Sequence, residues 1–127
     1  MSAEDLHYDE NHTWVRQEGG ELIIGITDYA QDQLGDIIFA ELPEEGTAIL
    51  AGDPFATVES AKAVQDVIAP VSGEVVRYNE ELMDTPEVIN EDPYGAGWMI
   101  AVKGDADALD SLLSYDKYVA MLESEEE

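Results

Sequence analysis

The chain has 127 residues, and its 30 aspartates and glutamates against 5 lysines and arginines give a formal net charge of -25 at pH 7. A surface this negative repels phosphate backbones and anionic lipid headgroups, which argues against nucleic acids and membranes as partners. The absence of cysteine excludes disulfides and thiolate metal sites.

The start of the chain is acidic and is unlike a secretory or transit peptide. No apolar run approaches the roughly 20 residues of a membrane-spanning helix. The length is that of a single domain with its own core. We therefore expect a single domain over residues 1–127, with loose ends at 1–5 and 123–127. We expect it to be cytoplasmic and monomeric.

The N-terminal part of the chain predicts a β-hairpin followed by a short helix. Strand-like runs lie at 12–16 and 21–26, and Gly19 and Gly20 form a turn between them. The helix is expected near 28–34. Thr27 can cap its free amides and Gly35 can end it, which leaves room for about two turns.

The middle of the chain predicts many short strands, at 36–42, 47–51, 54–58, 64–68 and 74–78. The runs 54–58 and 64–68 are separated by a few small residues, which is typical of a β-hairpin with Lys62 at or beside its exposed tip. Residues 79–94 are expected to be mostly loop. A last strong strand is expected at 98–103.

After Gly104 the apolar spacing becomes helical, with Asp105 or Asp107 as candidate caps. Two stripes are found, Leu109 with Leu112 and Leu113, and then Tyr115 with Val119 and Leu122. Short strands, one small helix and C-terminal helices together predict an all-β fold with minor helices, a flattened hybrid of barrel and sandwich.

A weak internal repeat favours a pseudo-two-fold plan. Residues 46–53 align with residues 73–80 in their glycine, apolar pair, turn residue and acid. The two copies lie on either side of Lys62. A hairpin between related halves would stand at one end of a pseudo-symmetric sandwich.

Other candidate sites are weak. Ser60 and Ser72 lack the context of a hydrolase nucleophile and a base partner. His7 and His12 are the only histidines, so a metal site would depend on carboxylates, and surface histidines are the better explanation. From the residues alone, an exposed lysine without a role is also the simpler explanation of Lys62.

The charge has two compatible explanations. One is a solvated surface suited to a high-salt cytoplasm, where self-repulsion is screened. The other is steering toward basic partner surfaces.

The segment 58–64, with its Glu-Ser-Ala-Lys-Ala core, resembles the lipoyl-carrying hairpin of the glycine cleavage H-protein family. Further segments resemble the same family in its order, from about Tyr8 to Leu122. They are 12–15, 25–31, 34–36, 41–43, Gly46, 70–75, 79–80, 88–94 and 97–98.

The resemblance implies the lipoyl- and biotinyl-carrier type of fold and a carrier rather than an enzyme, with no catalytic residue or metal site of its own. It implies covalent attachment of lipoic acid to Lys62. The supporting hairpin residues are Glu59, Ser60, Ala61, Ala63 and Asp66. Glu59 and Asp66 either mark the lysine for the attaching enzyme or are plain solvated carboxylates.

The implied partners are four kinds of enzyme. A pyridoxal-phosphate glycine decarboxylase loads an aminomethyl group on the arm, and a tetrahydrofolate-dependent aminomethyltransferase removes it. A FAD-dependent dihydrolipoyl dehydrogenase reoxidises the dithiol. A lipoate ligase or an octanoyl or lipoyl transferase attaches the cofactor.

Three positions depart from the family's usual residues. Thr13 stands where an acid is common, Gln33 where some members carry histidine, and Ala61 where valine is frequent. A lipoyl relay or storage protein for other complexes is the main alternative function. A biotin carrier is disfavoured because Lys62 lies between alanines rather than methionines, and an unmodified acidic interaction module is more remote.

Overall fold

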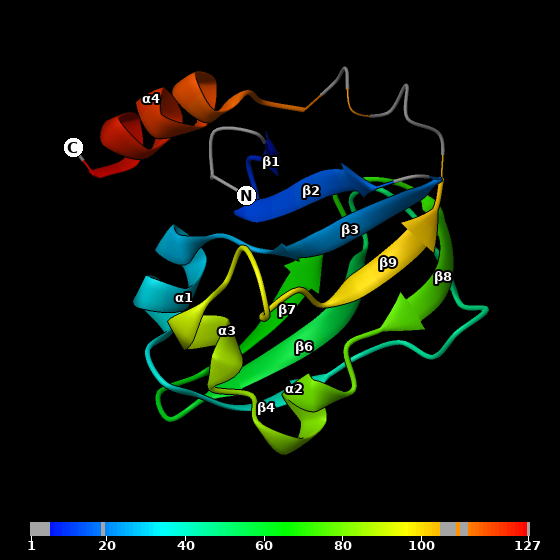
Figure 1. Ribbon diagram of the computed structural model, residues 1–127. Helices are drawn as coiled ribbons and strands as arrows, with labels where there is room; N and C mark the ends of the chain where they lie inside the picture. Colours follow the sequence, from blue (N-terminus) through cyan, green and yellow to red (C-terminus); the bar gives the residue numbers. More distant parts are fainter. Residues whose placement is uncertain (1–5, 19, 105–108, 110–111, 127) are drawn as a thin grey trace.

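The computed structural model describes residues 6–18, 20–104, 109 and 112–126. In this part of the chain, two antiparallel sheets form an open sandwich (Figure 1). The six-stranded sheet has the order β1 (His7–Asp9), β2 (Thr13–Glu18), β3 (Glu21–Ile26), β9 (Ile100–Lys103), β8 (Gly73–Tyr78) and β5 (Ala48–Ile49). The three-stranded sheet has the order β4 (Ile37–Glu41), β6 (Pro54–Ser60) and β7 (Val64–Ile68).

The main hydrophobic core lies between the two sheets. Ile24 and Ile100 reach it from the larger sheet and Val58 from the smaller one, and all three are fully buried. A second cluster covers the other face of the larger sheet, where Ile23 and Trp14 pack with Tyr118. Because β3 is buried on both faces, its sequence is a continuous apolar run rather than an alternating one.

Helix α1 (Asp28–Leu34) confirms the short helix and both of its expected ends. The Thr27 side chain accepts a hydrogen bond from the Ala30 amide at 3.2 Å. Gly35 follows with a φ of 81°, a left-handed backbone that favours glycine. The sequence-predicted hairpins β2–β3 and β6–β7 are also confirmed.

The internal repeat takes a specific form. Its two copies contribute β5 and β8, which pair antiparallel with each other, Ala48 opposite Glu74 and Ile49 opposite Gly73. An antiparallel pair has a local two-fold axis, as the predicted pseudo-two-fold plan requires.

Three expectations need correction. The sandwich is open, so the barrel part of the hybrid is absent from the described residues. The expected loop 79–94 contains two one-turn helices, α2 (Glu81–Asp84) and α3 (Val88–Glu91). Each has one buried apolar residue, Leu82 or Ile89, which is too short a pattern to show helical periodicity.

The third correction concerns the C-terminal helices. Leu113 does not continue a helix but exchanges backbone hydrogen bonds with Tyr8, and this β-bridge fixes the chain before α4 (Tyr115–Glu126). The cap candidates Asp105 and Asp107 lie outside the described residues, as does the expected loose end 1–5. Helix α4 extends to Glu126, so the segment 123–127, for which a loose end is expected, is helical as far as the structure describes it. In the described ranges, every helix is too short or too polar to cross a membrane.

Candidate functional site

Lys62 lies at the tip of the β6–β7 hairpin, and its side chain is exposed. The tip is closed by Ser60, whose hydroxyl oxygen accepts hydrogen bonds from the amides of Lys62 and Ala63 at 3.2 and 3.1 Å. The same hydroxyl is 3.2 Å from the Ala63 carbonyl, to which it donates. Ser60 is 5% exposed. A buried hydroxyl therefore fixes the backbone that presents Lys62.

The tip is also held from outside the hairpin. The Ala61 amide donates to the Asp36 carbonyl at 3.2 Å. The Asn90 side chain fixes the loop around Asp36, because it accepts from the Ile37 amide at 2.9 Å and donates to the Gly35 carbonyl at 2.8 Å and to the Gln31 side chain at 2.9 Å. Lys62 thus stands on an anchored loop rather than on a free one.

The stem of Lys62 lies over Gly35. A β-carbon added to Gly35 would be 3.2 Å from Cε of Lys62 and 3.6 Å from its Nζ. The amine therefore lies near the C-terminal end of α1, where the partial negative charge of the helix favours a cation. No ion pair joins Lys62 to a carboxylate in the described part of the chain.

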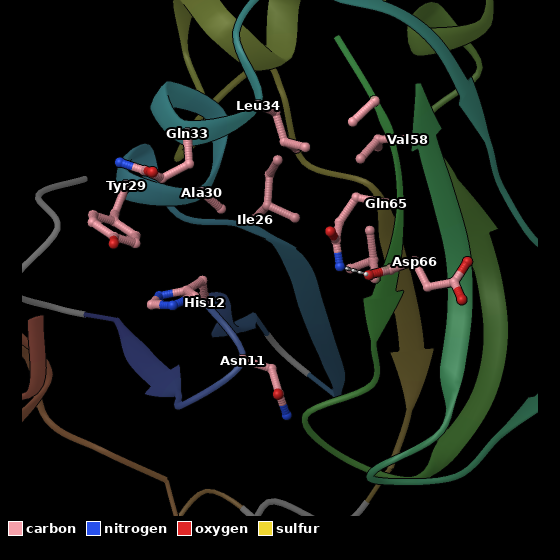
Figure 2. A pocket seen from close by; sticks show the side chains of 12 residues that line it. Asn11, His12, Ile26, Tyr29, Ala30, Gln33, Leu34, Val58, Gln65 and Asp66 are labelled. Atoms are coloured by element: carbon pink, nitrogen blue, oxygen red, sulfur yellow. Dashed lines mark hydrogen bonds between the residues drawn. The ribbon is translucent and has the colours of Figure 1, made fainter. Parts of the chain in front are cut away.

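A cleft of about 350 Å³ opens beside the tip, between the hairpin and α1 (Figure 2). Its apolar lining includes Ile26, Ala30 and Leu34 on one side and Val58 on the other. Ala63, next to Lys62, belongs to the lining, together with the polar residues Asn11, His12, Gln33 and Gln65. Asp66 also borders the cleft, but its carboxylate points away from it (Figure 2). A group attached to Lys62 would therefore have an apolar recess within reach.

The remaining predicted residues lie on or near the hairpin strands. Glu59 is exposed on β6, opposite Val64. Asp66 is exposed on β7, where Oδ1 accepts a long hydrogen bond of 3.4 Å from the Thr57 hydroxyl. Ala61 and Ala63 are exposed and small, so the sides of the lysine are open.

The departures from the family pattern fall in different places. Gln33 lines the cleft, and Ala61 lies on the tip. Thr13 is buried, and its hydroxyl has no hydrogen-bond partner in the described part of the chain. Only Gln33 therefore borders the recess directly.

Sequence reasoning missed the role of Tyr118. Its hydroxyl lies 2.8 Å from Nδ1 of His12 and 2.7 Å from the Thr27 hydroxyl. It thereby ties α4 to His12, which lines the cleft, and to Thr27, which caps α1. Among the described residues, no group of three or more histidines and acids is placed to hold a metal ion.

Burial raises the pKa of Tyr94, whose hydroxyl accepts a hydrogen bond from the Asp28 amide at 2.9 Å. The pKa of Tyr8 is also raised, mainly by burial and then by neighbouring tyrosines. Tyrosine is protonated at neutral pH in any case, so the raised pKa values report how closely these two rings are packed in the second cluster, on the other face of the larger sheet.

Comparison with known proteins gives consistent matches. The model of the family described as "Glycine cleavage H-protein" matches residues 6–125. The glycine cleavage system H proteins of Bacillus cereus (strain AH820) and Bacillus anthracis (strain A0248) are each 52% identical over 118 residues, which cover 92% of this chain and 93% of theirs. The crystal structure of a glycine cleavage system H protein from Mycobacterium marinum superposes with a TM-score of 0.84 at 36% identity, over 94% of this chain and 98% of that chain.

Proposed function

The chain belongs to the glycine cleavage H-protein family, and on that premise we propose that it is a lipoyl carrier with the cofactor attached to Lys62. The observation that carries the proposal is the exposed lysine on a tip closed by Ser60 and anchored through Asp36. In this role the protein takes an aminomethyl group from glycine decarboxylase to aminomethyltransferase, and the resulting dithiol to dihydrolipoyl dehydrogenase.

The residues present fit a lipoyl group. The amine is exposed, both flanking residues are alanines, and an apolar cleft begins at Ala63. Attachment forms an amide: Nζ bonds to the activated carboxyl carbon of the acid, the activating group leaves, and a proton passes to solvent. When bound, the lipoyl group supplies a disulfide that can be reduced, loaded and reoxidised on a long arm. A tether of this kind raises the effective concentration at each partner's site.

Amide formation also changes how the lysine is held. The free amine lies near the negative end of α1, beside Gly35. The amide is neutral, so this electrostatic attraction is lost. We assign the cleft lined by Ala30, Leu34 and Val58 as the resting place of the attached arm, because it is apolar and begins next to the tip.

The test is the mass of the intact protein after expression with lipoylation enzymes. One lipoyl increment is expected, mapped to Lys62, and it should disappear in Lys62→Arg. Lys103→Arg is the matched control, because Lys103 is also exposed, and it should keep the increment. A mark on Lys103 or Lys117, or a mark that survives in Lys62→Arg, would refute the assignment.

A second measurement separates the carrier from a lipoyl relay. The lipoylated protein should support exchange of bicarbonate into glycine by glycine decarboxylase, and the Lys62→Arg protein should not. A lipoylated protein that fails to support this exchange would favour the relay.

A further inference from the structure

Apolar side chains are exposed on the outer face of the three-stranded sheet, the face turned away from the core. Phe39 on β4 is 48% exposed, Val64 on β7 is 63% exposed, and Ile38 is 57% exposed. Phe39 lies opposite Glu59, which lies opposite Val64, so Phe39 and Val64 are in one cross-strand row with Glu59 between them. We call Ile38, Phe39 and Val64 the outer apolar row.

A β-bulge explains why Ile38 and Phe39 are both exposed. The register between β4 and β6 shifts between Ile37 and Phe39, so Ile38 is the extra residue. In a regular strand, alternation would turn Ile38 away from the face that Phe39 occupies. The bulge breaks this alternation and leaves two successive large apolar side chains open to solvent.

The outer apolar row is the part of this face next to Lys62. Ile37 pairs with Ser60, which closes the tip, and Val64 follows Lys62 by two residues. One pair further from the tip, the same face is polar, with Glu41, Thr57 and Asp66 in a row. Apolar exposure is therefore concentrated around the lysine.

The other side of the hairpin is partly covered. There Val58 and Gln65 line the cleft, and α1 and the turn containing His12 lie across from them (Figure 2). Nζ itself lies beside Gly35, at the end of α1. Because α1 and the turn containing His12 stand across the cleft, the outer face is the side of the tip without such a neighbour, and an enzyme that must reach Nζ can approach over it.

We propose that the outer apolar row docks the enzyme that forms the amide on Lys62, an inference that rests on the function proposed above. The chemistry selects this occupant. Amide formation takes place at Nζ itself, so the attaching enzyme must cover the tip and the side chains beside it. The decarboxylase, the aminomethyltransferase and the dehydrogenase act at the far end of the arm and do not need to contact the base of the lysine. Apolar side chains that become buried beside a reacting group are typical docking contacts.

The test measures lipoylation of the whole unmodified protein by a lipoate ligase supplied with lipoate and ATP, followed by intact mass. In Phe39→Gln and Val64→Gln, kcat/KM for the protein substrate should fall about 5- to 20-fold through KM, the range for losing one well-packed interface side chain. The limiting rate at saturating protein should change little, because Lys62 and its turn are intact.

Leu50→Gln is the matched control. Leu50 is 61% exposed, close to the value for Val64, but it precedes β6 at the end opposite Ser60. At 3.3 Å per residue, β6 separates the two ends by about 20 Å. Lipoylation of Leu50→Gln should stay within about twofold of the unsubstituted protein, and the melting temperatures of all the variants should agree within a few degrees.

The outcomes are distinct. An unsubstituted protein that gains no lipoyl mass refutes the proposed function itself. Normal kcat/KM in Phe39→Gln and Val64→Gln overturns the docking inference alone. The docking inference is also overturned if both variants are lipoylated normally while their turnover by glycine decarboxylase falls. A dimer of the unsubstituted protein in sedimentation that both substitutions dissociate would overturn it as well.

Discussion

The two faces of the β6–β7 hairpin offer Lys62 opposite surroundings. The inner face, with Val58 and Gln65, borders a recess that α1 closes from the other side. The outer face, with Glu59 and Val64, is open to solvent. A partly covered apolar recess suits the retention of a tethered group, whereas an open apolar surface suits a passing protein. On the function proposed above, a single lysine between them would be modified from one side and keep its cargo on the other.

The largest expected effect comes from removing the Asn90 side chain, whose hydrogen bonds fix the loop that anchors the tip between the two faces. In Asn90→Leu, the contacts to Gln31, Gly35 and Ile37 are lost. At about 1 kcal/mol per hydrogen bond, the free energy of unfolding should fall by about 2–3 kcal/mol in a denaturant titration. Gln33→Leu, which replaces an exposed amide on the neighbouring helix, should change it by less than about 0.5 kcal/mol. Equal stability of Asn90→Leu and the unsubstituted protein would show that the hydrogen bonds of the Asn90 side chain contribute nothing to the free energy of unfolding.

The next prediction asks whether the rate of lipoylation depends on the shape of the hairpin tip or on the stability of the fold. Ser60→Ala removes the acceptor of the Lys62 and Ala63 amides, so the tip loosens and lipoylation should slow several-fold, with a loss of stability of about 1 kcal/mol. Ser72→Ala is matched to it, because the Ser72 hydroxyl accepts from the Ala51 amide in a turn remote from Lys62. This control should lose similar stability and keep its lipoylation rate. If both variants slow equally, stability rather than tip geometry sets the rate.

A smaller effect tests the inner face alone. Ala30→Leu adds volume to the cleft and should displace the attached arm, without affecting the open side from which the lysine is modified. We expect an unchanged lipoylation rate and a two- to threefold faster reduction of the bound disulfide by a small phosphine. Ala51→Leu, at an exposed position, should change neither rate. Slower lipoylation of Ala30→Leu would mean that the two faces are not independent.

The smallest effect concerns charge on the outer face. The net charge of -25 and the nearby carboxylates Glu41, Glu59 and Asp66 should attract a basic enzyme surface, and added KCl should screen that attraction. Between 50 and 300 mM KCl, kcat/KM for lipoylation should fall about two- to fourfold, while an equal osmolarity of sucrose leaves it unchanged. A rate independent of KCl would leave the apolar row as the whole basis of docking on this face.

Much of the fold follows from the sequence because its strands are bounded by clear turns. The Thr27 cap and the left-handed Gly35 are local features, and so the position of α1 could be predicted closely. Lys62 could be placed at the tip for the same reason. The one-turn helices α2 and α3 could not be predicted, since a single buried residue such as Leu82 shows no period.

The details of the site depend on contacts between distant segments. Asn90 and Tyr118 act on residues more than 50 positions away, and no local pattern marks either of them for that role. The run Ile37-Ile38-Phe39 has the pattern of a buried strand. Two of these three side chains are exposed because of the bulge opposite β6, which a single sequence does not show.

The exposure of Lys62 in a chain so poor in basic residues provides a reporter of its own state. Trypsin cuts after lysine and arginine but not after an acylated lysine, and Lys62 is the only such residue between Arg16 and Arg77. A digest of the free protein divides the segment 17–77 in two, whereas a digest of the fully acylated protein leaves it whole. If Lys62 carries the proposed acyl group, the ratio of the whole segment to its fragments 17–62 and 63–77 would give the occupancy of the site in a mixed sample, without a label or an antibody.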